Sequence, residues 1–156
     1  MGPGSGATEI DIKNAYSLGK EIAKNSWILL SGGRNIGTMD AACRGAHEAG
    51  GLVVGILPSK DGSDASEGVD IRIVTGMGGG RNVINILSSD IVVICGMGAG
   101  TSSEVGHAVK CGKPTILLNT GEKAEAFFKE LAPEQVFIAK DVEDAIGLVQ
   151  KYMESN

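Results

Sequence analysis

The chain has few aromatic residues, histidines and cysteines, and these shortages argue against several kinds of site. Its 156 residues include 3 Phe, 2 Tyr, 1 Trp and 2 His. The three cysteines form no CxxC pair, and the two histidines have no HExxH-like spacing. We therefore expect no zinc or iron–sulfur site. Dispersed cysteines are typical of buried thiols in a reducing compartment, so we predict a cytoplasmic location.

Long apolar runs and basic clusters are also missing. No apolar stretch approaches the ~18–20 residues of a membrane-spanning helix. The net charge is -5, and Lys and Arg are scattered along the chain. We therefore expect neither a membrane nor a nucleic acid as a partner. The length and the 42% hydrophobic content predict one domain over residues 1–156 with a sizeable buried core.

Glycine, by contrast, is abundant. The chain has 24 glycines, roughly twice the usual ~7%. Glycine weakens helices and strands, so the position of these glycines in the fold has to explain the excess. Many of the glycines come directly after apolar segments that the pattern predicts to be strands. In open α/β sheets this is the carboxyl edge, where ligands bind.

Apolar segments alternate with amphipathic ones along the whole chain, which predicts an α/β fold. We predict strands over 27–30, 52–57, 71–74, 91–95, 115–118 and 136–139. We predict helices over 8–25, 38–49, 81–88, 101–111, 122–131 and 142–153. Continuously apolar strands separated by helices indicate a Rossmann-like, doubly wound, mostly parallel sheet with helices on both faces.

A repeated string predicts one further strand. Met-Gly-x-Gly occurs three times, at Met1-Gly2-Pro3-Gly4, Met77-Gly78-Gly79-Gly80 and Met97-Gly98-Ala99-Gly100. The second and third copies follow a predicted strand and precede a predicted helix, whereas the first has no strand before it. By analogy we expect a strand upstream of Met1, so that the chain begins inside a strand-to-helix turn. A sheet without a gap would contradict this expectation.

The glycine-rich turns predict an anion site. In residues 96–104, glycines and the start of a helix can present successive N–H groups to a phosphate. The string is neither a Walker A loop nor a dinucleotide fingerprint. The alternative is a tight turn without a ligand, with Thr101 and Glu104 forming only a capping box. We predict ligand contacts from Gly32, Gly33, Gly78, Gly79, Gly96, Gly98, Ala99, Gly100, Thr101 and Ser102.

Arg81 opens a predicted helix directly after the second glycine turn. A cation is mildly unfavourable at a helix N-terminus, so its position favours a functional role. The guanidinium could pair with a phosphate or a carboxylate in fork geometry.

These residues together carry a family resemblance. The pattern Gly32-Gly33-x-x-x-Gly37-x-Met39, Arg81 and Gly98-x-Gly100-Thr101-x-x-Glu104 resembles the LONELY GUY (LOG) family, often labelled "lysine decarboxylase-like". The similarity extends from residue 1 to about 120. It implies Rossmann-like dimers that release the base from cytokinin nucleoside 5′-monophosphates. It further implies Gly98, Gly100 and Thr101 around the phosphate, and catalytic roles for Arg81 and Glu104 at the ribose and the glycosidic bond.

The chain departs from the LOG pattern at four positions. Gly96 replaces the motif proline, Met97 the first loop glycine, Asn82 a lysine and Ser103 a glutamate. The missing lysine and glutamate argue against hydrolysis more than against binding. The chain is also similar to molybdenum cofactor carrier proteins, which hold a phosphorylated pterin without converting it. No lysine site for pyridoxal phosphate is apparent, so lysine decarboxylase activity is not expected.

Three functions follow from this reading. The first is a binding protein for a nucleotide monophosphate or a molybdopterin-type ligand, with no other cofactor required. The second is a phosphoribohydrolase that uses Glu104 as its carboxylate and Arg81 to orient the ribose phosphate. The third is a non-catalytic assembly protein. A homodimer or a larger homo-oligomer is expected from the resemblance.

Overall fold

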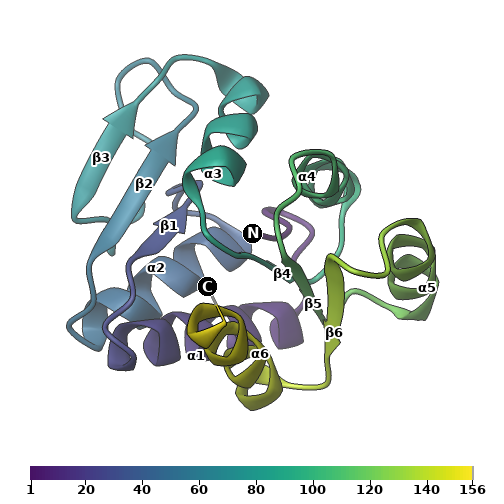
Figure 1. Cartoon of the computed structure of the whole chain (residues 1–156). Helices are drawn as coiled ribbons and strands as arrows, with labels where there is room; N and C mark the ends of the chain where they lie inside the picture. The colour runs from purple at the N-terminus through teal and green to yellow at the C-terminus, as the bar shows by residue number, and fades with distance from the viewer. Residues whose placement is uncertain (156) are drawn as a thin grey trace.

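A computed structural model of the chain describes residues 1–155 and has an α/β architecture (Figure 1). Six strands alternate with six α-helices and one 3-10 helix in the described part of the chain. In chain order the elements are α1 Glu9–Lys24, β1 Leu29–Ser31, α2 Gly37–Glu48, β2 Val53–Leu57, β3 Ile71–Val74, η1 Gly78–Arg81, α3 Asn82–Ser88, β4 Val92–Cys95, α4 Ala99–Lys110, β5 Thr115–Leu118, α5 Glu122–Leu131, β6 Val136–Ala139 and α6 Val142–Glu154.

The strands form two parallel three-stranded sheets, ordered β1-β2-β3 and β4-β5-β6. Helices α1, α2 and α6 lie below the strands in Figure 1, while α3 and α4 lie above them. The predicted Rossmann-like α/β fold, with helices on both faces of parallel strands, is therefore confirmed. The break between the two sheets lies between β1 and β4, where the repeated string predicts a further strand.

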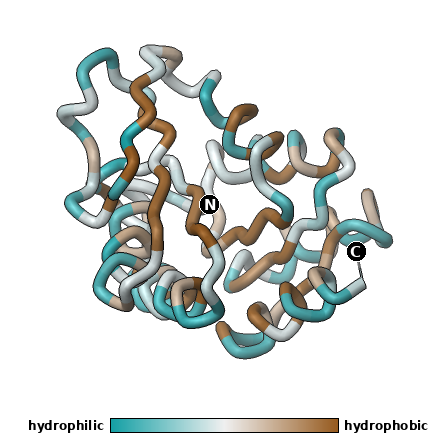
Figure 2. Tube along the Cα trace, turned by 60° about the vertical axis from the view of Figure 1, so that its left-hand side comes forward, coloured by the Kyte–Doolittle hydropathy of each residue, from teal (hydrophilic) through white to brown (hydrophobic). Residues whose placement is uncertain are grey.

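Apolar strands lie at the centre of the molecule and the helices turn their polar sides outward (Figure 2). One apolar cluster joins α1 and α6 to one face of β4 and β5, with Leu18, Ile116 and Leu118 at its centre. A second cluster lies on the opposite face under α4 and α5 and includes Ile94 and Phe128. The two clusters bury β5 on both sides, which explains why its last three residues, Ile116 to Leu118, are all apolar.

Helices α1 and α2 pack closely, and glycines make the approach possible. A Cβ at Gly19 would overlap the Ala42 carbonyl of α2, and a Cβ at Gly45 would overlap the Tyr16 carbonyl of α1. The start of α1 carries the predicted capping box, in which Thr8 Oγ1 accepts the amide of Asp11 and the Asp11 carboxylate accepts the amide of Thr8. These contacts fix the start of α1 and hold the helix against α2.

Candidate functional site

Three turns that each precede a helix converge at the carboxyl edge of the strands. The amide and the hydroxyl of Thr38, at the start of α2, both donate to the carbonyl of Pro3, at 3.1 and 3.0 Å. A Cβ at Gly98 would lie 3.5 Å from Pro3 Cβ. The amino-terminal turn, the turn after β1 and the turn after β4 therefore form one continuous rim.

The start of α4 offers free backbone amides to this rim. The helix begins at Ala99, two residues earlier than predicted, with Gly98 as an N-cap that makes no side-chain hydrogen bond. The first amides of a helix have no acceptor within it, so those of Ala99, Gly100 and Thr101 point out of the helix start. The first turn of α4 contains no acidic residue. These amides and the positive end of the helix dipole suit an anion.

The capping-box alternative for this turn is wrong. Thr101 is the third residue of α4 rather than its N-cap, and its side chain is buried. Ser102 lies in the same first turn and is exposed, and its amide donates to the carbonyl of Gly98 at 2.8 Å. A Cβ at Gly100 would meet open space.

Arg81 lies beneath the same rim. It ends η1, and only 6% of it is exposed. Its Nη2 lies 3.8 Å from the sulfur of Met39 on α2, whereas the buried Nε has no hydrogen-bond partner. A Cβ at Gly32 would overlap Arg81 Nη1 and would lie 2.7 Å from Nη2, so the glycine after β1 makes room for the guanidinium. A buried cation with an unpaired N–H group is costly unless something pairs with it.

Glu104 shares this electrostatic environment. It lies on α4 one turn after the free amides and is 8% exposed. Burial raises the pKa of Glu104, and the charges of the amino terminus and Arg81 oppose that rise. Burial also lowers the pKa of Arg81, while the charge of Glu104 raises it. No ion pair joins the two side chains in residues 1–155, so each acts on the other through space.

The remaining predicted contact residues have different surroundings. Gly96 has φ +77°, and a Cβ there would lie 2.5 Å from the carboxylate carbon of Asp11. Gly33 has φ +68° and lies in a turn in which its amide donates to Ser31 Oγ and its carbonyl accepts the amide of Ser66. Gly78 and Gly79 are exposed in η1, with no atom within 4 Å of an added Cβ. Gly33 and Gly96 thus allow the backbone conformation of their turns, while Gly78 and Gly79 are exposed to solvent.

Sequence reasoning missed two polar side chains beside the rim. Asn85 is fully buried on α3, one helical turn after Arg81, and neither its Oδ1 nor its Nδ2 has a partner. Asp11 is buried behind Gly96 and accepts a hydrogen bond from Asn119 Nδ2 at 2.8 Å. The i, i+4 spacing of Arg81 and Asn85 signals a shared helix face. Only packing reveals that this face is buried.

No group of three or more His, Cys, Asp or Glu side chains in residues 1–155 could hold a metal ion. No helix in this part of the chain is long and apolar enough to cross a bilayer.

The fold and the rim define a Rossmann-like α/β protein with an amide-lined, cationic edge. The chain belongs to the SLOG cluster4 family, whose model matches residues 1–146. This membership and the structures below confirm the predicted resemblance.

Two solved structures are very similar to this chain. The molybdenum cofactor binding protein of Rippkaea orientalis is 52% identical, with a TM-score of 0.96 over 98% of this chain and 94% of that one. The molybdenum cofactor carrier protein of Chlamydomonas reinhardtii is 46% identical, with a TM-score of 0.95 over 100% of this chain and 96% of that one. A cytokinin riboside 5′-monophosphate phosphoribohydrolase of Rhodococcoides fascians is 26% identical over 87% of this chain and 79% of its own length.

Proposed function

We propose that this chain binds a phosphorylated ligand of the molybdopterin or nucleotide monophosphate class at the rim. The observation that carries the proposal is the uncapped start of α4 beside the buried Arg81, whose Nε has no partner. The similarity to proteins described as binding or carrying the molybdenum cofactor supports the pterin class of ligand.

The binding mode follows from the available donors. A phosphate accepts hydrogen bonds from the amides of Ala99, Gly100 and Thr101, and the exposed hydroxyl of Ser102 adds a further donor. Arg81 supplies the compensating positive charge from below the rim. These groups would hold the phosphate of a molybdopterin, whose metal chemistry belongs to the ligand itself.

Paired glycine substitutions in α4 test this binding mode. Gly100 and Gly106 both lie in α4, and a Cβ at either position meets no atom within 4 Å. Alanine at either position favours the helix by up to about 1 kcal/mol. Only Gly100→Ala adds a methyl group next to the proposed phosphate amides. We expect Gly100→Ala to weaken ligand binding about tenfold or more, a loss of ~1.4 kcal/mol, while Gly106→Ala binds as the unmodified protein does.

Calorimetric titration and thermal unfolding provide the measurements. The ligands are molybdopterin, AMP and inorganic phosphate, each at several concentrations. A ligand at 100 times its Kd adds ~2.7 kcal/mol to the free energy of unfolding. Equal affinity of both variants would contradict the placement of the phosphate. The absence of any shift with every phosphate compound would favour the non-catalytic assembly protein instead.

Glu104 supports a second candidate, a phosphoribohydrolase. Loss of a base from a nucleotide passes through an oxocarbenium-like state, which requires a carboxylate near the anomeric carbon and a water molecule. Glu104 is a buried carboxylate beside the proposed phosphate position, and a phosphoribohydrolase is among the relatives. Incubation with AMP separates the two candidates, because only the hydrolase releases free base and ribose 5-phosphate. Release that persists in Glu104→Gln would exclude this residue as the catalytic carboxylate.

A further inference from the structure

The carboxylate of Asp11 is buried where the start of α1 meets the turns that follow β4 and β5. Asp11 lies in the first turn of α1 and is 4% exposed. Its Oδ2 accepts the amide of Thr8 at 2.9 Å, and its Oδ1 accepts the side-chain amide of Asn119 at 2.8 Å. Asn119 directly follows β5, so this one carboxylate links the start of α1 to the turn after β5.

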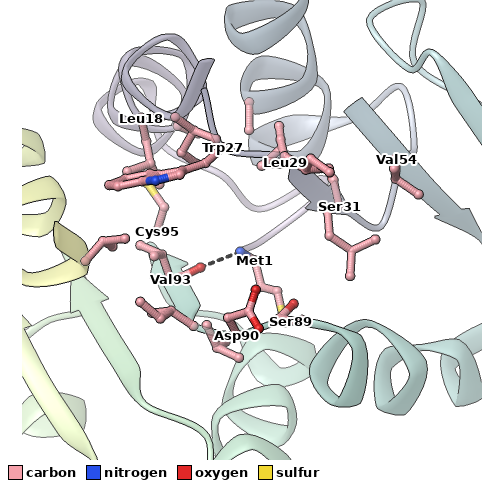
Figure 3. A pocket seen from close by; sticks show the side chains of 18 of the residues that line it. Met1, Leu18, Trp27, Leu29, Ser31, Val54, Ser89, Asp90, Val93 and Cys95 are labelled. Atoms are coloured by element: carbon pink, nitrogen blue, oxygen red, sulfur yellow. Dashed lines mark hydrogen bonds between the residues drawn. The ribbon is translucent and has the colours of Figure 1, made fainter. Parts of the chain in front are cut away.

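The turn after β4 is bound to the same residue. The thiol of Cys95, the last residue of β4, donates to the main-chain carbonyl of Asp11 at 3.3 Å. Figure 3 shows the side chain of Cys95 on the α1 side of β4, near Leu18, and the two side chains belong to one apolar cluster. Gly96 comes next, and its amide donates to the carbonyl of Leu118 at 2.9 Å. The turn after β4 is therefore held by α1 and by the end of β5.

Gly96 makes room for the Asp11 carboxylate. A Cβ at Gly96 would lie 2.5 Å from Cγ of Asp11 and 2.6 and 2.8 Å from its two carboxylate oxygens. A side chain at this position would displace either the carboxylate or the turn, and the φ of +77° disfavours a side chain as well. Position 96 is also where this chain has glycine in place of the proline of the LOG pattern. The glycine in the turn and the carboxylate behind it therefore depend on each other.

Hydrogen bonds alone hold this buried carboxylate. None of the ion pairs within residues 1–155 includes Asp11. A buried carboxylate without a cation is costly unless donors surround it, and an ionised carboxylate can only accept. Asn119 supplies one donor from a left-handed backbone conformation, with φ +55°. Glycine adopts this conformation more readily but has no side chain that could donate to Asp11.

We propose that Asp11 is a positioning residue of the phosphate site, and that its bond with Asn119 holds the Gly96 turn so that the free amides of α4 converge on one phosphate. The inference rests on the proposed function. Only two residues separate Gly96 from Ala99, the first residue of α4, and the N-cap between them makes no side-chain hydrogen bond. The orientation of these amides therefore depends on the other end of the turn. As an anion, Asp11 would repel a phosphate, so it acts through the turn and not as a ligand contact.

Two single substitutions separate positioning from stability. Asn119→Gly removes the donor to Asp11 and keeps a residue that tolerates φ +55°. Thr8→Ala is the matched control, because it removes the hydroxyl that caps α1 and leaves the carboxylate of Asp11 with both of its donors. Thr8→Ala should lower Tm by roughly 2–4 °C and leave the Kd for inorganic phosphate within about twofold. Asn119→Gly should raise that Kd about tenfold, the effect of one lost charge-assisted hydrogen bond.

A titration with inorganic phosphate measures these Kd values. Nitrogen–proton NMR correlation spectra follow the three free amides at the start of α4 during the titration. Asp11→Ala should weaken phosphate binding as Asn119→Gly does. Asp11→Asn should recover most of the lost affinity, because its side chain still accepts the amide of Thr8 and the amide of Asn119 can turn round to accept from it.

The outcomes distinguish this inference from the proposed function. If phosphate does not shift the α4 amides of the unmodified protein, the proposed function fails and the role of Asp11 fails with it. If the unmodified protein responds and Asn119→Gly has the same Kd, the phosphate site stands and the positioning role is refuted. An equal rise in Kd for Thr8→Ala would also overturn the positioning role, because any weakening of α1 would then suffice. If Asp11→Ala does not fold, the comparison of Asn119→Gly with Thr8→Ala still gives the answer.

Discussion

The buried Arg81 lowers the stability of the fold, and we propose that it also binds the ligand. The substitution Arg81→Met separates these two effects. Arg81 is 6% exposed, its Nε has no hydrogen-bond partner, and its Nη2 donates to the sulfur of Met39 at 3.8 Å. An unsatisfied buried polar group costs about 1–3 kcal/mol. Methionine has a similar length and no charge, and replacing a buried charge by a packed apolar side chain is often stabilising. We therefore expect Arg81→Met to raise the free energy of unfolding without ligand by about 1–3 kcal/mol.

The same substitution removes the positive charge beneath the rim. The unmodified protein should gain ~2.7 kcal/mol at 100 times the Kd of its phosphorylated ligand, and Arg81→Met should gain almost none. Removal of Arg81 also raises the pKa of Glu104 further, since the guanidinium charge holds that pKa down. Protonation of Glu104 then limits any loss of stability from the missing cation.

Urea unfolding with and without ligand measures both effects. Arg44→Met is the matched control, because Arg44 is an exposed arginine on α2 whose Nε lies 3.9 Å from Asp40. Its change in stability should stay within about 0.5 kcal/mol. If Arg81→Met lowers stability by more than 1 kcal/mol, or retains the full ligand effect, the reasoning about this site fails.

Three further predictions concern other parts of the molecule. Burial raises the pKa of Glu104, so its carboxyl stabilises the fold below its ordinary pKa and loses that contribution as pH rises through the raised value. Glu104→Gln should therefore gain stability relative to the unmodified protein from about pH 4.5 upward, and a difference that shrinks with rising pH in denaturant titrations would contradict this. Burial raises the pKa values of Cys43 and Cys95 to about 11, whereas Cys111 is exposed. One thiol per chain should react rapidly with DTNB at pH 8, and its loss in Cys111→Ser identifies it. Ile73 lies on β3, a strand whose four residues are all exposed, so we expect association through this strand. Light scattering should then show a smaller species for Ile73→Lys, and an unchanged mass would exclude β3 as the interface.

Local patterns were sufficient to predict most elements of this fold. The strands Ile71–Val74, Thr115–Leu118 and Val136–Ala139 and the helix Glu122–Leu131 have the predicted bounds. Apolar run length and turn residues act within a few positions of each other, so they can be read locally. The start of α4 was predicted two residues late, at Thr101 instead of Ala99. Glycine-rich sequence has weak helix propensity, and the packing of Thr101 and Glu104 overrides it.

The candidate site also has features that the sequence predicts and features that only the tertiary structure shows. Position after a strand was enough to select Arg81 and the glycine turns, because a parallel sheet brings its carboxyl ends to one edge. The burial of Arg81 against Gly32, the unpaired amide of Asn85 and the carboxylate of Asp11 behind Gly96 depend on contacts between distant segments.

The sequence alone therefore determined the α/β class, the parallel strands and the family resemblance, since each rests on short-range order along the chain. Only the tertiary structure decided which charges are buried, which amides are free and where the sheet is open. Those properties arise when segments far apart in the chain exclude water from one another, and no local pattern records that exclusion.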